Sequence, residues 1–282
     1  MKQKVIAVVG PTASGKTALA IKLAQEKNGE IVSADSRLVY KGFDIASAKP
    51  TFEERNGIPH HMIDIVEPTT TYSTGDYYKD AKLVIENILS RGKTPIIAGG
   101  TGLYFRVLLE NYNLPQVDTD LKLRSELESY EKDDLLNQIK EIDSITYERV
   151  KDANKRRIVR ALELIKTLNK PLSELELEKT PEYDVEWIMP PIESREWLYE
   201  RINKRVDIMV EMGIIEETKN LIAKYGRLST ITETIGYKEI LTYLDGTSSL
   251  EEALDKLKQH TRNYAKRQLT WFRKNPNLNV NI

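Results

Sequence analysis

The sequence predicts an α/β protein in which a largely parallel sheet, flanked by helices, is interrupted by an all-helical insertion. In residues 1–117, short apolar runs alternate with segments of helical spacing, which is the order of a parallel sheet with crossover helices. Residues 118–180 are strongly charged, helical in pattern and free of β-branched runs. A last apolar run and several helical segments follow. We therefore expect a core made of 1–117 and 181–282, with 118–180 as a separate helical domain.

Each expected strand is a short apolar run bounded by turn-forming residues. The strands are expected at Val5–Val9, Glu30–Ala34, His60–Val66, Thr94–Ala98 and Val185–Met189. Outside the insertion, helices are expected at Thr17–Lys27, Thr74–Arg91, a stretch after Gly102, Ser194–Glu211, Ile214–Tyr225, Thr234–Tyr243 and Ser249–Lys274. The segment Tyr40–Pro50 follows neither period, so we expect it to be irregular.

The chain has 282 residues, of which 30% are charged and 40% hydrophobic, as in a soluble globular protein. The net charge of -1 predicts no global attraction to nucleic acid, so a site for a polyanion must come from local clusters. The absence of cysteine excludes disulfides, thiolate zinc sites and cysteine nucleophiles. A strand directly after the N-terminus leaves no room for a signal peptide, and no apolar run approaches the roughly 20 residues that cross a bilayer. We expect a cytoplasmic protein without a membrane segment.

A glycine-rich loop between the first strand and the first helix is the strongest motif. Its residues Gly10, Pro11, Thr12, Ala13, Ser14, Gly15, Lys16 and Thr17 match G-x-x-x-x-G-K-[ST], the pattern of a phosphate-binding P-loop. Backbone N–H groups and the positive end of the helix dipole favour a bound phosphate. Lys16 adds a positive charge, and Thr17 adds a hydroxyl for Mg²⁺. We therefore expect a P-loop NTPase-like core whose ligand is ATP, another nucleotide or a diphosphate.

Two further groups follow strands that end at the same edge of the sheet. Asp35 comes directly after the second strand, and Thr101 lies in the glycine turn after the fourth. Because ligands of open parallel sheets bind beyond the carboxyl ends of strands, we expect both side chains near the P-loop. Taken alone, Asp35 is equally compatible with a turn or N-cap role. The adjacent His60 and His61 would point to opposite faces of a strand, which favours structural roles over a shared metal.

Two helical segments carry clusters of basic residues. The first places Arg156 and Arg160 on one helix face with Arg157 beside them, and the second is Ser249–Lys274, in which aromatic residues are interleaved. Basic residues with aromatic neighbours can neutralise phosphates and stack on bases, although a solvated helix face has the same pattern. Two such clusters favour a nucleic-acid partner.

These motifs, in their order along the chain, resemble the tRNA dimethylallyltransferase family over nearly the whole sequence. The resemblance rests on Gly10–Thr17, Ala34–Ser36, Tyr40–Pro50, Pro59–Ile65, Gly99–Tyr104, Arg156–Glu163, Arg201–Arg205, Ile235–Lys238 and Tyr264–Trp271. It implies transfer of a dimethylallyl group from dimethylallyl diphosphate to N6 of adenosine 37, directly 3′ of the anticodon, in tRNAs that read codons beginning with U. Diphosphate is released. It also implies a mobile helical insertion that closes on the anticodon stem-loop. No Cys–His tail follows Trp271, which favours a bacterial type, and we expect a monomer.

The same resemblance implies the roles of individual residues. Asp35 would accept the proton of the adenine amine or orient it, Thr101 would contact the substrate nucleotide, and Arg205 would reach the diphosphate. The P-loop would hold that diphosphate, with Mg²⁺ at Thr17. The implied tRNA contacts are Asp35, Ser36, Arg37, Leu38, Thr101, Arg124, Arg156, Arg157, Ile158, Val159, Arg160, Gly236, Tyr237, Lys238, Lys266, Arg267, Gln268, Trp271 and Arg273. Glu233 lies among these segments, but its negative charge would oppose a polyanion.

Two alternatives use the same motifs. A nucleotide or small-molecule kinase also combines a P-loop, a parallel sheet and a helical lid, and Asp64 would then be an acidic Mg²⁺ ligand at a strand end. A non-enzymatic RNA-binding protein could use the P-loop ligand only as a switch. A kinase would transfer a labelled phosphoryl group from ATP to an acceptor. The non-enzymatic RNA-binding protein would keep its function when Asp35 is replaced by alanine.

Overall fold

The computed structural model describes residues 2–110, 112–115, 117, 120–175, 180–278 and 280. By contacts the chain divides into a core unit, Met1–Glu110 with Pro181–Ile282, and a helical unit, Asn111–Thr180. The core unit therefore ends seven residues earlier than the limit of 117 expected from the sequence, while the later limit is the same. The expected start at residue 118 lies outside the described residues.

The described strands form one parallel sheet, as expected, in the order β3-β2-β4-β1-β5. Their bounds are β1 Gln3–Val9, β2 Gly29–Ala34, β3 His60–His61, β4 Thr94–Gly99 and β5 Tyr183–Ile188. The prediction for the third strand was too long, since it named His60–Val66. Met62 and Asp64 both have positive φ, which ends the extended backbone there, and only Val66 returns as an isolated bridge to Tyr40.

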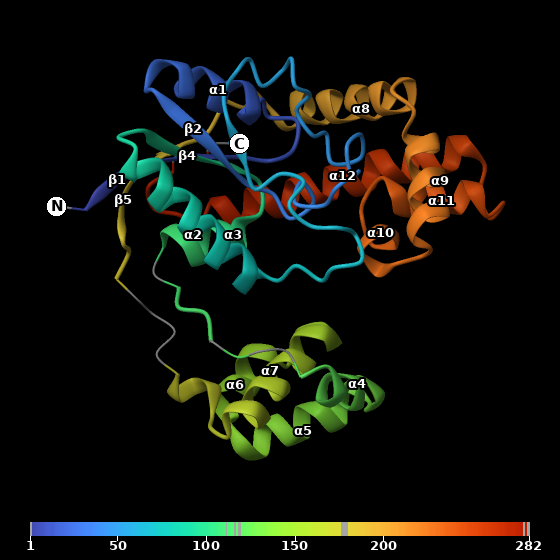
Figure 1. Ribbon diagram of the computed structural model, residues 1–282. Helices are drawn as coiled ribbons and strands as arrows, with labels where there is room; N and C mark the ends of the chain where they lie inside the picture. The colour runs from blue at the N-terminus through green and yellow to red at the C-terminus, as the bar shows by residue number, and fades with distance from the viewer. Residues whose placement is uncertain are drawn as a thin grey trace. The chain divides into compact units, whose positions relative to one another are not determined.

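The helices of the core unit surround this sheet and extend beyond it (Figure 1). They are α1 Lys16–Glu26, α2 Thr74–Ser90, α3 Gly102–Leu109, α8 Arg195–Glu211, α9 Ile214–Tyr225, α10 Ser229–Thr232, α11 Tyr237–Leu244 and α12 Leu250–Phe272. Ser73 caps α2 and Ser249 caps α12, each in a capping box with an acidic third residue, Asp76 or Glu252. The helix expected from Thr234 begins only at Tyr237, because Gly236 has a φ of 108°.

The sheet is buried on both faces, which explains why its central strands read as continuous apolar runs. On one face, Ile6, Val8, Ile31 and Ile96 pack against Ala20, Ile21 and Ala24 of α1. On the other face, β1, β2 and β4 pack against α2, α3 and Phe272 of α12. Because β1, β2 and β4 pair in parallel, all three strands end at one edge, beside the loops that follow them.

At the opposite end of the sheet lies a cluster of charges around Glu30, the second residue of β2. Its carboxylate accepts hydrogen bonds from Arg91 at 2.6 and 2.7 Å and from Lys93 at 2.7 Å, and lies 2.8 Å from His61 Nε2. The bond from Arg91, which outweighs the opposing effect of burial, keeps the pKa of Glu30 far below its ordinary value. His60 instead bonds the carbonyl of Ile58 through Nδ1 at 2.8 Å. Both histidines thus have the structural contacts expected of them.

The helical unit has a core of its own. Its helices are α4 Leu121–Ser129, α5 Lys132–Ile142, α6 Ser144–Val150 and α7 Lys155–Leu168, with the short 3-10 helix η1 Leu172–Glu174. Helix α7 is the central element: Ile158, Val159, Leu162 and Ile165 recur at helical spacing and are buried against α4 and α5. Asp143 caps α6 and also accepts a hydrogen bond from the Ser173 N–H. Burial raises the pKa of Asp143, but the hydrogen bonds from Thr146 and Ser173 outweigh burial and lower the pKa to about 2.

Across the described part of the chain, none of the helices combines the length and apolar character that a membrane span requires.

Candidate functional site

Three loops meet at the carboxyl edge of the sheet. The P-loop follows β1, Asp35 follows β2, and the turn of Gly99, Gly100 and Thr101 closes β4, which lies between β1 and β2. The backbone of this turn is tied directly to β2, because the Thr101 N–H donates to the Ala34 carbonyl at 3.1 Å. The topology therefore brings the P-loop, Asp35 and Thr101 to one place, as the order of the motifs predicts.

A cavity of about 550 Å³ opens beside these loops and lies entirely in the core unit. It is lined by Thr12, Lys16, Thr17 and Arg205, which are groups suited to a phosphate. Asp35 and Tyr264 also line it, together with residues from two segments, Ala46–Ala48 and Glu233–Glu239, which form one wall. Val206, Met209 and Leu257 make part of the lining apolar. The cavity thus combines cationic groups with a carboxylate.

Two basic residues of the cavity lining, Lys16 and Arg205, lie close enough for the charge of Arg205 to act on Lys16. Burial, then the positive charge of Arg205, lowers the pKa of Lys16 to about 8, and the carboxylate of Asp35 opposes this shift. Burial also lowers the pKa of Arg205, again against the effect of Asp35. The pKa of a cation falls where its charge is poorly compensated. An anion bound between Lys16 and Arg205 would supply the missing compensation.

Asp35 sits at the start of a tight turn, where its Oδ1 accepts from the Arg37 N–H at 2.8 Å. This hydrogen bond is the turn contact that the sequence analysis considered for Asp35. It uses Oδ1 and not Oδ2. The neighbouring phenols are buried: burial first, and the Asp35 charge next, raise the pKa of Tyr104 and Tyr264 above the ordinary tyrosine range. Tyr104 stacks on Tyr77 with ring centroids 3.7 Å apart. Burial therefore keeps these phenols protonated beside the Asp35 carboxylate.

Thr101 acts on the same turn from the opposite side. Its hydroxyl oxygen accepts a hydrogen bond from the Ser36 N–H at 3.1 Å. Thr101 precedes α3 but makes no side-chain cap for that helix. The hydroxyl therefore fixes the backbone that carries Asp35, whatever else it contacts.

Gln268 joins the P-loop to the glycine turn and was assigned a different role by the sequence. Its Oε1 accepts from the Thr12 N–H at 2.9 Å, and its Nε2 donates to the Gly100 carbonyl at 3.0 Å. The residue is 5% exposed, and a Cβ on Gly100 would lie 2.1 Å from Nε2. Because both ends of the amide are bonded to protein, we now interpret Gln268 as a residue that positions the P-loop, and we count the Thr12 N–H among its partners.

Arg201 was missing from the predicted site residues. Its Nε donates to the Ala13 carbonyl in the P-loop at 2.8 Å, and its guanidinium lies 4.7 Å from the Trp197 ring centroid. Arg201 and Arg205 are four residues apart on α8, so they share a helix face. That spacing is the signal that could have identified Arg201 once Arg205 was assigned to the diphosphate.

The residues expected to contact tRNA fall into three groups by exposure. The exposed ones are Arg156, Arg157, Lys238, Lys266, Arg267, Trp271 and Arg273, whereas Ile158, Val159, Gly236, Tyr237 and Gln268 are buried and the others are half-buried. Ile158 and Val159 belong to the core of the helical unit, and Tyr237 packs in the core of α9–α11. Because the buried side chains pack inside the protein, contact with RNA at these positions stays a prediction that their side-chain geometry does not favour.

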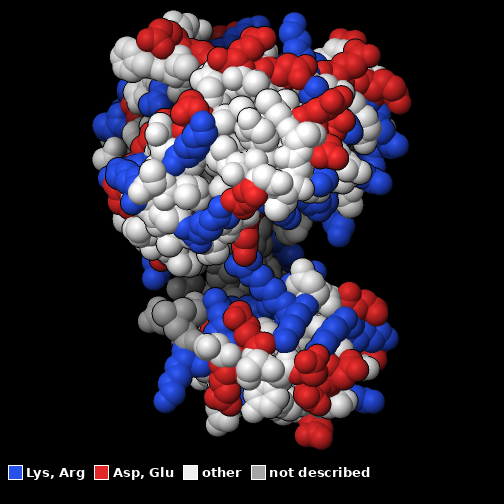
Figure 2. Space-filling view, turned by 90° about the vertical axis from the view of Figure 1, so that its right-hand side faces the viewer, with Lys and Arg blue, Asp and Glu red and all other residues white. Residues whose placement is uncertain are grey.

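In the helical unit, two of the predicted arginines converge on one acid. Glu163 is fully buried, and its Oε2 lies 2.7 Å from Arg124 Nη2 and 3.0 Å from Arg160 Nη1. The hydrogen bond to Arg124 has good geometry, whereas the contact to Arg160 is an ion pair only. On the face of this unit seen in Figure 2, Lys and Arg side chains are interspersed with Asp and Glu side chains.

The comparisons with known proteins point in one direction. The family described as IPP transferase matches residues 38–275, which begins after the P-loop and Asp35. A tRNA dimethylallyltransferase of Pelotomaculum thermopropionicum is 46% identical over 97% of this chain and 88% of its own length. The enzyme of the same name from Oceanobacillus iheyensis is 43% identical over 99% of this chain and 90% of its own. Both alignments extend over nearly the whole of this chain.

Solved structures give the same result. A tRNA isopentenylpyrophosphate transferase of Staphylococcus epidermidis matches with a TM-score of 0.70 and 43% identity, over 99% of this chain and 92% of that one. A eukaryotic dimethylallyltransferase crystallised in the act of modifying tRNA matches with a TM-score of 0.85 and 33% identity, over 96% of this chain and 70% of that one.

Proposed function

The chain belongs to the IPP transferase family, and we propose that it transfers a dimethylallyl group from dimethylallyl diphosphate to N6 of adenosine 37 in tRNAs that read codons beginning with U, releasing diphosphate. A single observation supports this reaction best: one cavity is lined both by the cations Lys16 and Arg205 and by the carboxylate of Asp35. A transferase needs both groups, the first for its leaving group and the second for its nucleophile.

The leaving group is the diphosphate. As the C–O bond of the allylic carbon breaks, negative charge accumulates on the departing oxygen. Lys16 and Arg205 would stabilise that charge, and the backbone N–H groups of the P-loop other than that of Thr12 would orient the phosphates. Both cations have a lowered pKa in the free protein, so their charges become better compensated when diphosphate is bound.

Mg²⁺ belongs to the same proposal. Among the described residues, no group of three or more His, Asp or Glu side chains is arranged to hold a metal. Mg²⁺ commonly keeps several waters and binds through one or two protein oxygens together with substrate phosphates, and the Thr17 hydroxyl at the cavity fits that requirement. When bound, Mg²⁺ would supply neutralisation of the diphosphate charge.

The nucleophile is the exocyclic amine of adenine, which is a weak base. A new bond forms between N6 and the allylic carbon, and the amine then loses one proton. Asp35 would accept that proton, and the hydrogen bonds at Thr101 and at the Arg37 N–H support this role by fixing the turn that carries it. The adenine must leave the base stack to enter the cavity, which costs a few kcal/mol.

The RNA would be held by exposed basic residues on two helices. Arg156 and Arg157 lie on α7 of the helical unit. On α12, Lys266, Arg267 and Trp271 line a shallow depression of about 230 Å³. Arginine and lysine neutralise phosphates, and an exposed tryptophan offers a stacking surface. We also propose that this activity takes place in the cytoplasm and that the protein is a monomer.

The kinase alternative is weakened by Asp64. It was the candidate acidic Mg²⁺ ligand, but it forms an ion pair with the buried Nζ of Lys49. Its carboxylate is therefore already compensated, and it is not among the residues that line the cavity.

One reaction mixture tests the proposal. Unmodified tRNA is incubated with the protein, Mg²⁺ and dimethylallyl diphosphate, and its nucleosides are measured by mass spectrometry. We expect N6-dimethylallyladenosine at one position, adjacent to the anticodon. A parallel mixture contains ATP labelled on its γ-phosphate and no prenyl donor. Label passing from ATP to an acceptor, with no prenylated nucleoside in the first mixture, would replace the proposal by the kinase alternative.

A further inference from the structure

One wall of the cavity is made by a segment without regular structure. Between the end of β2 at Ala34 and the start of β3 at His60 there is no helix or strand, yet Ala46, Ser47 and Ala48 from this segment line the cavity. Long irregular segments in compact domains are uncommon and are usually functional. Because no ladder of backbone hydrogen bonds holds this wall, side chains must hold it.

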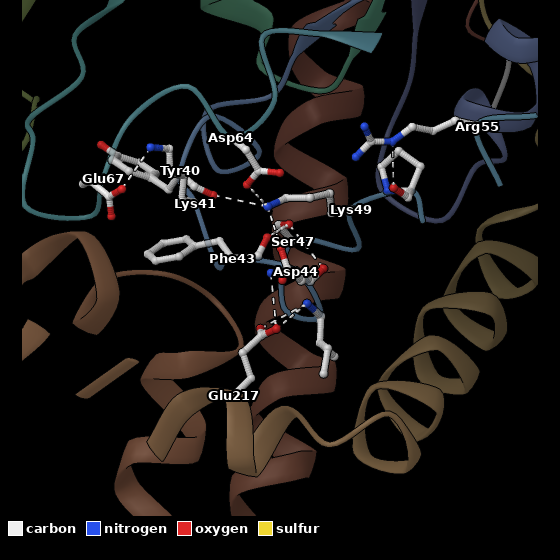
Figure 3. Close-up of polar contacts among 12 residues, drawn as sticks. Tyr40, Lys41, Phe43, Asp44, Ser47, Lys49, Arg55, Asp64, Glu67 and Glu217 are labelled. Atoms are coloured by element: carbon white, nitrogen blue, oxygen red, sulfur yellow. Dashed lines mark hydrogen bonds and ion pairs between the residues drawn. The ribbon is translucent and has the colours of Figure 1, made fainter. Parts of the chain in front are cut away.

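From one side the wall is held by Lys49, whose side chain is 6% exposed. Its ammonium pairs with Asp44 at 2.6 Å and with Asp64, and it donates to the Tyr40 carbonyl at 3.3 Å. Figure 3 shows Lys49 reaching across the turn to these groups. Lys49 therefore ties the segment to itself and to the chain that follows β3.

From the other side the wall is held by Glu217, which comes from α9. Its carboxylate accepts from the N–H groups of Ile45 at 2.8 Å, Ala46 at 3.2 Å and Asp44 at 3.3 Å. Figure 3 shows the Glu217 side chain directed toward the turn at Asp44. Three consecutive N–H groups that converge on one anion form a backbone nest. The conformation of the turn thus depends on a negative charge supplied from another element.

Glu217 also connects this turn to the second segment of the wall. Its Oε1 accepts from the Tyr237 hydroxyl at 2.7 Å. Next to Tyr237, Gly236 lies so close to the turn that an added Cβ would be 2.8 Å from the Ala46 Cβ. Segments Ala46–Ala48 and Glu233–Glu239 are therefore in contact, and one carboxylate joins them behind the cavity.

We propose that Glu217 is a positioning residue that sets how far the wall of Ala46 and Ala48 stands from Val206 and Met209 of α8, and thereby the size of the apolar group that the cavity accepts. The inference rests on the proposed function, because the apolar group is the prenyl chain of the substrate. Met209 lies one helical turn beyond Arg205, so a chain attached to a diphosphate at Arg205 would extend toward this wall.

The test separates the diphosphate from the prenyl chain. Both oxygens of Glu217 accept hydrogen bonds from backbone N–H groups of the turn. In Glu217→Gln one of them becomes an NH₂ group, which cannot accept, so the turn loses at least one of these hydrogen bonds in either orientation of the amide. We expect about tenfold weaker binding of dimethylallyl diphosphate by calorimetry, with binding of inorganic diphosphate changed less than about twofold, because Lys16, Thr17 and Arg205 are untouched. In competition with tRNA as acceptor, the use of geranyl diphosphate relative to dimethylallyl diphosphate should rise.

The matched control is Glu216→Gln. Glu216 precedes Glu217 on α9 but is exposed, and it pairs with Lys219 at 2.7 Å, so its replacement should change the binding of neither ligand. Tyr237→Phe removes a single hydrogen bond of Glu217 and should shift the same preference by a smaller factor. It also serves as the second variant if Glu217→Gln melts well below the wild type.

Three results would overturn the proposal. One is equal weakening of inorganic diphosphate and dimethylallyl diphosphate, which would indicate general damage. Another is an effect in Glu216→Gln as large as in Glu217→Gln, and the third is an unaltered prenyl preference in both Glu217→Gln and Tyr237→Phe. Failure of the proposed function gives a different pattern, in which the wild type binds dimethylallyl diphosphate without modifying tRNA. The affinities of wild type and Glu217→Gln for dimethylallyl diphosphate and inorganic diphosphate would then still test the role of Glu217. A wild type that binds no prenyl diphosphate would overturn both.

Discussion

The two units hold their basic residues in opposite ways. At the cavity of the core unit, burial lowers the pKa of both Lys16 and Arg205, and the nearby charge of Arg205 lowers the pKa of Lys16 further. In the helical unit, Arg124 and Arg160 share the buried carboxylate of Glu163. Among the described residues, neither member of the first pair forms an ion pair with an acid, whereas both members of the second lie within 3.0 Å of one carboxylate.

The difference indicates what each group is for. Cations whose charge is under-compensated gain most from an anionic ligand, and Lys16 and Arg205 lie where a diphosphate would bind. Cations already paired to a buried acid mainly hold local structure, because removing their partner leaves charge without compensation. In the helical unit, the surface for RNA is therefore expected from the exposed Arg156 and Arg157 more than from Arg124 and Arg160.

The largest effect is expected at Asp35, the carboxylate that acts on both cavity cations. Asp35→Asn keeps an oxygen for the Arg37 N–H but removes the proton acceptor. We expect turnover to fall by about a thousandfold, with tRNA affinity changed less than about threefold, because general-base groups typically contribute 10²–10⁴-fold. Single-turnover transfer and a filter-binding assay measure the two quantities. Turnover close to that of the wild type would place the proton acceptor elsewhere.

The helical unit should respond at Glu163. In Glu163→Gln the side chain that pairs with Arg124 and Arg160 becomes neutral inside the core, and we expect about 3 kcal/mol of lost stability in that unit. Hydrogen exchange of α4 and α7 would measure it, while binding of dimethylallyl diphosphate to the core unit stays unchanged.

The control for that change is Glu148→Gln on α6. Glu148 is exposed and pairs with Lys151 at 2.6 Å, so its loss should cost less than about 0.5 kcal/mol. Equal protection losses in the two variants would show that burial of Glu163 is not what stabilises the unit.

A smaller effect is expected at Gln268, which holds the loop that carries Lys16. Gln268→Leu leaves the Thr12 N–H and the Gly100 carbonyl without their partner, so the P-loop should lose part of its preorganisation. We expect on the order of twentyfold weaker binding of inorganic diphosphate, measured by calorimetry. Gln259→Leu, at an exposed position of the same helix, is the control. Unchanged binding in Gln268→Leu would return Gln268 to a role in RNA contact.

The mildest perturbation is pH. The pKa of Lys16 is lowered to about 8 in the free protein, so raising the pH through 8 removes the charge that a diphosphate needs, while a bound diphosphate raises that pKa and keeps the proton. Binding of dimethylallyl diphosphate without tRNA should therefore weaken about tenfold between about pH 7 and pH 9, with proton uptake. Lys16→Arg, which stays protonated, should flatten the profile; a steep profile in that variant would assign the titration to another group.

Much of this protein follows from local patterns. Apolar runs and helical spacing predicted the parallel sheet, nearly all the core helices and the irregular nature of Tyr40–Pro50, because a side chain's face is set by the period of its own element. The motifs predicted that the P-loop, Asp35 and Thr101 converge, since the carboxyl ends of parallel strands share one edge. The length of the third strand was predicted poorly, since the strand ends at His61. The positive φ angles of Met62 and Asp64, which end it, have no distinct signal in the residue types.

The sequence by itself determined the chemistry of the site, because the residue types that bind phosphate and accept protons stand next to strand ends. Only the tertiary structure decided what holds that chemistry in place. Gln268 meets Thr12 across 256 residues, Arg201 meets Ala13 across 188 and Glu217 meets Ile45 across 172. The same is true of burial, which favours internal supports over RNA contacts for Tyr237 and Gln268. A hydrogen bond requires approach within about 3 Å, and at such separations only the packing of whole elements brings two groups that close.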